Sequence, residues 1–376
     1  MPLSILNVED ARQAARRRLP RMIFDYIDGA AGTERLNALN QSIFEAHRLQ
    51  PRVLVNVENR QLGKTILGQQ FDLPFGISPM GMCNLAWPDA DFMLADAAQK
   101  YNIPVCLSTM GSSTIEQMRQ RAGENCWFQL YVGASVNEAM SLVDRAEQAG
   151  YTHLILSVDV PVVAQRQRDV RNGFKAPLRI GPRQFFDFAT HPVWSISSLF
   201  NGIPALANIE QNAPDGEKFN RDAGRGATDW SFLETLRQRW PHQLIVKGIM
   251  SVDDALQVKQ YGADAVYVSN HGGRQLESAP TALEALIKIR EVVGNDYPLL
   301  FDSGVRSGES VVKALACGAD FVFMGRPFSY AVGAGQQRGL NQLVELFSRE
   351  ISSVIAQLGC TDVKNIDASV LAETKR

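Results

Sequence analysis

The sequence predicts an α/β protein, a (β/α)₈ TIM barrel, from three observations. Eight short apolar runs recur along the 376 residues, and longer amphipathic segments separate most of them. The runs are rich in Val, Ile, Leu and Phe, which is typical of parallel strands that are buried on both faces. Polar residues follow every run. Eight βα units are the number that closes a barrel, and a doubly wound open sheet is the alternative.

The predicted strands are each a handful of residues long. They cover residues 73–78, 104–108, 127–131, 153–159, 243–247, 265–269, 299–302 and 321–324. Helices are predicted between most of them, at residues 89–100, 135–148, 230–239, 253–260, 282–293 and 309–316.

Two segments interrupt this alternation, so we expect one barrel domain over residues 1–376 with two additions. Residues 1–70 precede the first strand, begin with helical patterning and are expected to cap one end of the barrel. Residues 168–228 interrupt the fourth βα unit and are rich in Pro, Gly, Asn and aromatic residues. A loop this long within a compact domain is usually functional.

Composition excludes several classes of protein. Hydrophobic residues make up 45% and charged residues 21%, as in soluble globular proteins, and a net charge of −2 does not favour a nucleic-acid partner. The five cysteines are scattered without a C-x-x-C pair, which predicts a reducing, cytoplasmic location and no metal site. We see no signal peptide at the N-terminus and no apolar run of the ~18 residues that a membrane span needs.

The C-terminal ends of the strands are where chemistry is expected in such a barrel. Hydrogen-bonding side chains stand at or just after the ends of all eight strands, including Ser78, Ser108, Gln129, Ser157, Lys247, Ser269, Asp302 and Arg326. Glycine and arginine follow both of the last two strands, as Gly304 with Arg306 and Gly325 with Arg326. This combination favours a phosphate site, and tight turns are the alternative role for the glycines.

His271 is the strongest candidate for a catalytic base among the five histidines. It alone follows the end of a strand, and Gly272 and Gly273 beside it leave space for a ligand. Asp159 is its expected partner, because a carboxylate orients an imidazole and raises its basicity. A buried structural aspartate is the alternative for Asp159.

Three further cations are candidates for binding anionic groups. Arg166 and Arg274 suit a substrate carboxylate, because a guanidinium binds it through two parallel hydrogen bonds. A surface role is the alternative for Arg166 and the preferred interpretation for Arg168. Lys247 ends an apolar strand, where its charge would stabilise an anionic ring such as a reduced flavin.

Residues 269–275 read SNHGGRQ, which resembles the signature of the FMN-dependent 2-hydroxy-acid oxidase and dehydrogenase family. Similar matches occur in order along the chain, at residues 19–26 (LPRMIFDY), 128–132 (FQLYV), 246–248 (VKG), 302–306 (DSGVR) and 325–326 (GR). The resemblance covers almost the whole chain and is greatest to the mandelate and membrane L-lactate dehydrogenases of that family. Gly81, for example, stands where the family's oxidases usually carry alanine.

The resemblance implies FMN as the cofactor and an active site of six residues, Tyr26, Tyr131, Asp159, Arg166, His271 and Arg274. Tyr26 enters this set on resemblance alone. The implied FMN contacts are Gly81, Ser108, Gln129, Ser157, Lys247, Ser269, Asp302, Arg306, Gly325 and Arg326, with Pro79, Met80, Ser303 and Gly304 at the same strand ends.

The implied reaction oxidises an (S)-2-hydroxy acid, mandelate- or lactate-like, to the 2-keto acid and passes electrons to a quinone or another carrier. An oxidase that uses dioxygen and a non-catalytic flavin-binding barrel are the alternatives. Hydride transfer and a carbanion route both remain open. Departures from the family pattern at Met80, Asn84, Met110 and residues 30–34 leave the particular acid open.

The resemblance also implies a homotetramer on the inner face of the cell membrane. Residues 177–208 combine aromatic and aliphatic residues with arginines, which suits a membrane surface, and prolines at 182, 192 and 204 argue against a spanning helix. A lid over the active site and a contact between subunits are the alternative roles for this segment.

Overall fold

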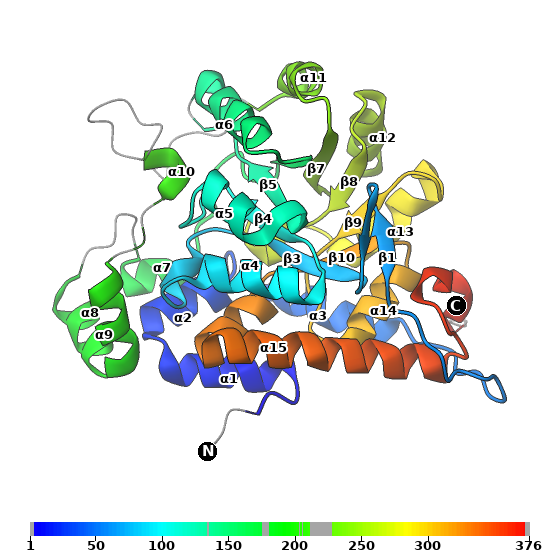
Figure 1. Cartoon of the computed structure of the whole chain (residues 1–376), viewed down its shortest axis with the longest axis horizontal. Helices are drawn as coiled ribbons and strands as arrows, with labels where there is room; N and C mark the ends of the chain where they lie inside the picture. The colour runs from blue at the N-terminus through cyan, green and yellow to red at the C-terminus, as the bar shows by residue number, and fades with distance from the viewer. Residues whose placement is uncertain are drawn as a thin grey trace.

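The computed structural model describes residues 4–133, 135–174, 180–202, 204, 206–210 and 228–372. Within them, eight parallel strands close into a barrel (Figure 1), in the order β10-β3-β4-β5-β6-β7-β8-β9. The strands are β3 (Phe75–Met80), β4 (Val105–Ser108), β5 (Cys126–Leu130), β6 (His153–Ser157), β7 (Gln243–Ile249), β8 (Ala265–Val268), β9 (Leu299–Phe301) and β10 (Phe321–Met324). All eight coincide with the predicted runs, which confirms the predicted barrel.

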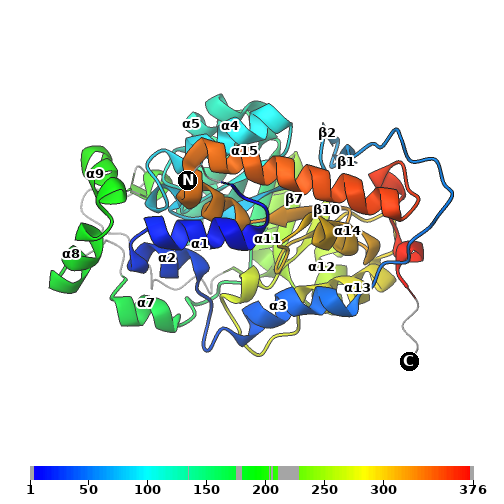
Figure 2. The same ribbon diagram turned by 90° about the horizontal axis from the view of Figure 1, so that it is seen from below.

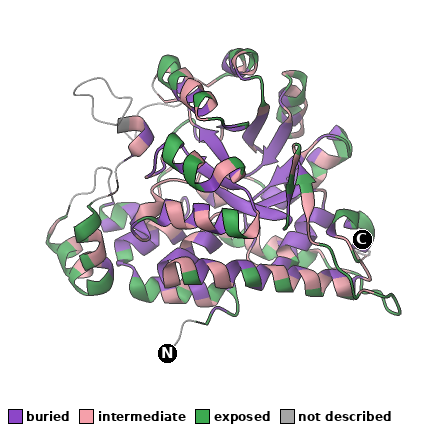
Figure 3. Ribbon diagram, in the orientation of Figure 1, coloured by how far each residue is buried: buried purple, intermediate pink, exposed green. Residues whose placement is uncertain are grey.

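Helices surround the barrel and bury its strands, which appear as the purple centre of Figure 3. The helices that follow strands are α4 (Ala90–Tyr101), α5 (Ile115–Ala122), α6 (Val136–Gln148), α11 (Trp230–Arg239), α12 (Val252–Gln260), α13 (Ala282–Val293), α14 (Gly308–Ala316) and α15 (Arg326–Gln357). Short 3₁₀ turns lie at Cys83–Leu85, Gly123–Asn125, His271–Gly273, Val363–Asn365 and Ala368–Val370. Helix α15 was not predicted; it includes the glycine-rich residues 333–339 and is interrupted at Gly335 and Gln336.

The N-terminal segment reaches both ends of the barrel, whereas the sequence suggested one. Helix α1 (Val8–Arg18) packs along α15, and α2 (Arg21–Asp28) and α3 (Arg35–Ala46) lie near the C-terminal ends of the strands. The antiparallel strands β1 (Lys64–Ile66) and β2 (Gln69–Phe71) cover the opposite end.

His153 ties this β1–β2 hairpin to the barrel. Its Nε2 lies 3.1 Å from the Leu67 carbonyl oxygen, and its ring stacks on Trp127 with centroids 4.5 Å apart. Trp127 in turn donates from Nε1 to Gln69 Oε1 at 2.9 Å. Burial lowers the pKa of His153 to about 4, so the ring is neutral at pH 7. A neutral histidine therefore holds the β1–β2 hairpin against the end of the barrel that lies away from the predicted site.

The insertion after β6 contains α7 (Gln167–Asn172), α8 (Pro182–Ala189), α9 (Pro192–Asn201) and α10 (Ala207–Glu210). Proline stands in the first turn of both α8 and α9, where its missing N–H costs no helical hydrogen bond. Figures 1 and 2 both show α8 and α9 at the edge of the molecule. Among the described residues, no helix is long and apolar enough to cross a bilayer. Residues 177–179, 203 and 205 of the predicted membrane segment lie outside the described residues.

Candidate active site

A cavity of about 230 Å³ opens at the C-terminal ends of the strands, and residues from all eight strand ends line it. Strand register explains this convergence. Ser108 pairs with Gln129 on the neighbouring strand, and Ser157 pairs with Lys247, so polar residues that are distant in sequence share one rim. The predicted polar rim is therefore present as a cavity.

Most of the predicted site residues line the cavity directly. They are Tyr26, Pro79, Met80, Gly81, Ser108, Tyr131, Ser157, Arg166, Lys247, His271, Arg274, Asp302, Ser303, Gly304, Arg306, Gly325 and Arg326. Gln129, Asp159 and Ser269 lie one layer behind and contact lining side chains. Sequence reasoning missed an apolar part of the wall, formed by residues such as Met82, Val160 and Leu206, because apolar side chains carry no distinguishing pattern.

His271 and Asp159 lie in direct contact. The Nδ1 atom of His271 is 3.0 Å from Asp159 Oδ2 and 3.1 Å from Oδ1. Burial alone would raise the pKa of Asp159, but the charges of His271 and Lys247 hold it below its ordinary value. The carboxylate is thus ionised and fixes the proton of the imidazole on Nδ1, which leaves Nε2 as the basic nitrogen.

Backbone conformation brings this pair together. His271 has a φ of 58°, in the left-handed region that residues with a side chain rarely adopt, and Gly272 and Gly273 continue the turn. Gly248, with a φ of 103°, lies against Asp159, and a Cβ there would be 2.5 Å from the Asp159 Cβ. Only glycine allows the approach of β7 to the aspartate.

Lys247 belongs to a buried polar chain at the same rim. Its Nζ donates to Ser269 Oγ at 2.7 Å and lies 3.5 Å from Asp302 Oδ2 and 3.9 Å from Asp159 Oδ2. Ser269 donates in turn to Asp302 Oδ1 at 2.6 Å. The ammonium is therefore held at the cavity wall by two carboxylates and a hydroxyl.

Two buried polar atoms at this rim have no hydrogen-bond partner within the described part of the chain, Gln129 Nε2 and Ser157 Oγ. The other amide atom of Gln129 accepts from Ser108 Oγ at 2.8 Å, which fixes its NH₂ group as the unpaired donor. Buried donors without partners are rare and call for a ligand. The carbonyl oxygens and ring nitrogens of a flavin are acceptors, so these residues and Lys247 fit an isoalloxazine ring.

The turns after β9 and β10 fit the phosphate of FMN. Gly304 has a φ of 94°, and a Cβ there would lie 1.9 Å from the Asn40 carbonyl oxygen. Arg306 lines the cavity, and burial lowers the pKa of its guanidinium to about 10, so it stays charged at pH 7. Arg326 also lines the cavity but donates to the carbonyls of Ile27, Gly29 and Gly272. Arg306 donates to one carbonyl, that of Val305, and is thus the cation better placed for an anion.

Three side chains that suit a substrate carboxylate lie together: Tyr26, Arg166 and Arg274. The guanidinium of Arg274 lies 5.4 Å from the centre of the Tyr26 ring, and that of Arg166 lies 5.5 Å from it. Phe174 stacks on the same ring at 4.4 Å. Arg166 is paired through Nε with Asp169 at 3.0 Å, and its side chain is 11% exposed. The surface alternative for Arg166 is therefore wrong.

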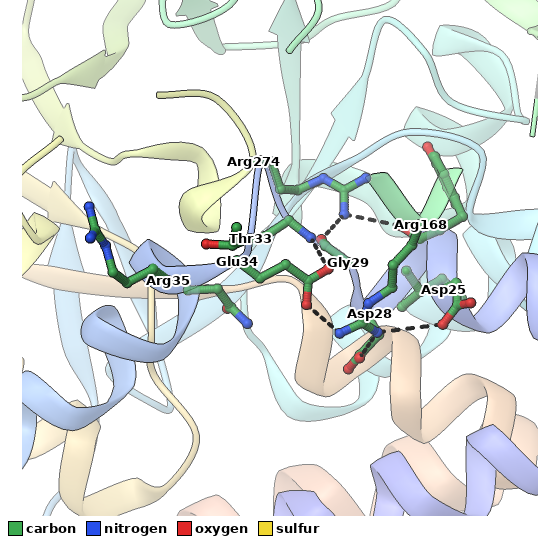
Figure 4. Close-up of polar contacts among 12 residues, drawn as sticks. Asp25, Asp28, Gly29, Thr33, Glu34, Arg35, Arg168 and Arg274 are labelled. Atoms are coloured by element: carbon green, nitrogen blue, oxygen red, sulfur yellow. Dashed lines mark hydrogen bonds and ion pairs between the residues drawn. The ribbon is translucent and has the colours of Figure 1, made fainter. Parts of the chain in front are cut away.

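The surface interpretation of Arg168 is also wrong. Its guanidinium is paired with Asp28 at 2.6 Å, with Asp25 at 3.5 Å and with Glu34, as Figure 4 shows. The side chain is 30% exposed. Arg168 thus belongs to a cluster of charges behind the cavity.

The barrel and its rim define a flavin-dependent oxidoreductase. A family model described as FMN-dependent dehydrogenase matches residues 15–373, so the chain belongs to the FMN-dependent dehydrogenase family and FMN is its cofactor.

Individual relatives match over nearly their whole length. The chain is 37% identical to (S)-mandelate dehydrogenase of Pseudomonas putida over 99% of this chain and 95% of the relative. It is 36% identical to L-lactate dehydrogenase of Pseudomonas syringae pv. syringae, over 98% and 99%. The crystal structure of (S)-mandelate dehydrogenase, described as a monotopic membrane protein, superposes with a TM-score of 0.94 at 36% identity and covers 99% of this chain and 100% of that one.

Proposed function

We propose that this enzyme oxidises an (S)-2-hydroxy acid, mandelate- or lactate-like, to the corresponding 2-keto acid. The observation that carries the proposal is the His271–Asp159 pair at 3.0 Å, beside a cavity that two arginines also line. The relatives named above support it, since they are called mandelate and lactate dehydrogenases. FMN, when bound, accepts the two electrons that the acid loses.

The residues of the chain have separable roles in this proposal. Arg166 and Arg274 bind the substrate carboxylate, with Tyr26 between them. Tyr131 contacts the substrate hydroxyl from the cavity wall. Nε2 of His271 takes a proton, because Nδ1 is held by Asp159, and the carboxylate then stabilises the imidazolium. The charge of Lys247 stabilises negative charge on the reduced ring.

The test is an anaerobic series of aliphatic and aromatic 2-hydroxy acids, each mixed with the yellow enzyme while the flavin absorption is followed. We expect one class of (S)-acid to bleach the flavin, with the 2-keto acid formed in equal amount. Arg274→Lys should weaken apparent binding of that acid, because lysine cannot form the paired hydrogen bonds. A flavin that no 2-hydroxy acid bleaches would refute the proposal and favour a non-catalytic flavin-binding barrel.

We further propose that a quinone or another carrier, and not dioxygen, reoxidises the enzyme, because the relatives named above are called dehydrogenases and mandelate dehydrogenase superposes with the higher TM-score. A specific observation favours the second candidate, an oxidase: mandelate oxidase superposes with a TM-score of 0.83 at 31% identity and covers 98% of both chains. Reduced enzyme mixed in a stopped-flow instrument with air-saturated buffer or with a soluble quinone separates the two. Faster reoxidation by air than by the quinone would identify an oxidase.

The α8–α9 hairpin is the proposed site of contact with the inner face of the cell membrane. Its outer side exposes Phe185, Phe186, Val193, Ile196, Leu199 and Phe200, which are between 56% and 84% exposed. Its inner side is anchored, because Trp194 donates to the Leu85 carbonyl and Asp187 accepts from the first N–H groups of α2. A helical pair that is anchored on one side and presents apolar side chains on the other suits the interface of a bilayer.

The membrane proposal is tested by flotation with vesicles that contain anionic phospholipid. The double variant Phe185→Ser, Phe200→Ser should float less than wild type. A matched control, Leu6→Ser with Val292→Ser, removes exposed apolar groups elsewhere and should float normally. Equal flotation of the two variants would favour a lid or a subunit contact instead, as would a wild-type protein that never floats.

The proposed homotetramer needs an apolar contact surface, and the loop that contains Val53 and Leu54 offers one, since these residues are 81% and 103% exposed. Light scattering should give the mass of four chains, and Leu54→Asp should lower it. A wild-type mass of one chain would contradict this.

A further inference from the structure

The turn formed by residues 29–34 lies between the insertion and the loop that carries His271. On the side of the insertion, the N–H of Gly32 donates at 3.3 Å to the carbonyl of Gln165, which precedes the insertion by three residues. The stem of Arg168 packs beside Gly29, such that a Cβ there would lie 3.8 Å from Arg168 Cδ. The turn therefore contacts the residues at the start of the insertion.

The same turn fixes the substrate arginine on its other side. The N–H of Ala31 donates to the Gly273 carbonyl at 3.0 Å. Nη1 of Arg274 donates to the Tyr26 carbonyl at 3.0 Å. It also donates to the Gly29 carbonyl at 2.7 Å (Figure 4). The guanidinium is thus held by two carbonyls, and the one with the shorter hydrogen bond, that of Gly29, belongs to the turn.

Charge holds the turn in place. Arg168 bridges Asp28, at the end of α2, and Glu34, at the end of the turn. Glu34 has a φ of 68°, which is unfavourable for a residue with a side chain, and its other carboxylate oxygen accepts from the N–H of Ala30 at 3.1 Å. Glu34 therefore closes the turn with one carboxylate oxygen and pairs with Arg168 through the other.

We propose that Arg168 is a positioning residue for substrate binding, which acts through the 29–34 turn on Arg274. The proposal rests on the proposed binding of the substrate carboxylate by Arg274. Arg168 does not line the cavity, so its effect must be transmitted. Without it, Glu34 loses the cation that it shares with Asp28, whereas Asp28 keeps its ion pair with Arg12. The turn then relaxes at its Glu34 end, and the Gly29 carbonyl shifts away from the Arg274 guanidinium, which keeps only the Tyr26 carbonyl.

The first test compares Arg168→Gln with wild type by anaerobic flavin reduction over a range of substrate concentrations. We expect the apparent Kd for the acid to rise at least about tenfold, while the limiting rate of reduction changes less than about threefold. Arg168→Lys should give an intermediate Kd, because an ammonium keeps the charge but cannot bridge two carboxylates with a planar fork. Arg171→Gln is the matched control, since Arg171 is an exposed residue of the same helix and should leave the Kd unchanged.

A double-mutant cycle tests the route. If Arg168 acts through Arg274, Arg168→Gln should add no further loss of affinity in an Arg274→Gln background. Additive losses, or an Arg168→Gln enzyme with bound FMN and wild-type affinity, would overturn the proposal. If Arg168→Gln does not fold, Glu34→Gln enters the same cycle with the same expectations.

The proposed function can fail separately. If no 2-hydroxy acid reduces the wild-type flavin, the cycle is measured with a 2-keto acid, whose binding is read from the shift in flavin absorption. Arg168→Gln should then weaken binding of the keto acid in the wild-type background but not in the Arg274→Gln background. That result would support the positioning role of Arg168 and refute only the proposed reaction.

Discussion

Replacement of Asp159 by asparagine removes one charge from the site and hardly changes the shape of the side chain. The carboxylate oxygens lie 3.0 and 3.1 Å from His271 Nδ1. Unit charges about 4 Å apart, centre to centre, attract by ~4 kcal/mol at an effective dielectric constant of ~20. The amide oxygen keeps a hydrogen bond of ~1 kcal/mol. The stabilisation of the imidazolium should therefore fall by ~3 kcal/mol, which slows proton abstraction ~10²-fold.

The assay is the limiting rate of anaerobic flavin reduction at saturating substrate, measured by stopped flow. FMN content and melting temperature are measured on the same preparation, to separate catalysis from folding. Asp253→Asn makes the same chemical change at an exposed position after β7 and should leave the rate unchanged. An Asp159→Asn enzyme that retains FMN and reduces it within about threefold of the wild-type rate would refute the role assigned to this carboxylate.

Three further predictions follow from other parts of the molecule. Gly248→Ala should displace Asp159 and lower the rate of flavin reduction with FMN still bound, because its Cβ would lie 2.5 Å from the Asp159 Cβ; a wild-type rate would contradict the close approach. Arg306→Ala should weaken FMN retention on dialysis more than it changes substrate affinity, and full retention would remove Arg306 from the phosphate site. The pKa of His153 is about 4 in the folded state, below the ordinary 6.5, so the unfolded chain binds the proton more readily. Wild-type stability should therefore fall by up to ~3 kcal/mol between pH 6.5 and pH 4. Urea unfolding of His153→Gln should show a smaller loss, and equal losses would disprove the assignment.

Apolar runs were enough to predict the barrel, because each strand is buried on both faces and must be hydrophobic throughout. The β1–β2 hairpin escaped prediction because its strands are three residues long and include Lys64, Gln69 and Gln70. Helix α15 escaped because residues 333–339 are rich in glycine, which is unfavourable in isolated helices and is tolerated here by burial.

In the site, too, residues with a local sequence pattern could be predicted, and residues defined by distant contacts could not. His271 could be predicted because a polar side chain that directly follows a buried barrel strand lies at the rim of the barrel. Arg168 could not, because what makes it half-buried is a set of partners 134 to 143 positions away in sequence. Nothing local distinguishes it from Arg171, which lies on the surface of the same helix.

The left-handed backbone of His271 has a consequence for the evolution of this chain. A residue with a side chain at a φ of 58° costs of order 1 kcal/mol, whereas glycine or asparagine adopts this conformation more readily. Relief of this strain favours replacement of His271, but any replacement also leaves the buried Asp159 carboxylate without the imidazole that lies 3.0 Å from it. His271→Gly and His271→Asn should therefore raise the melting temperature more in an Asp159→Asn background than in the wild-type background, and every such variant should be inert toward its acid.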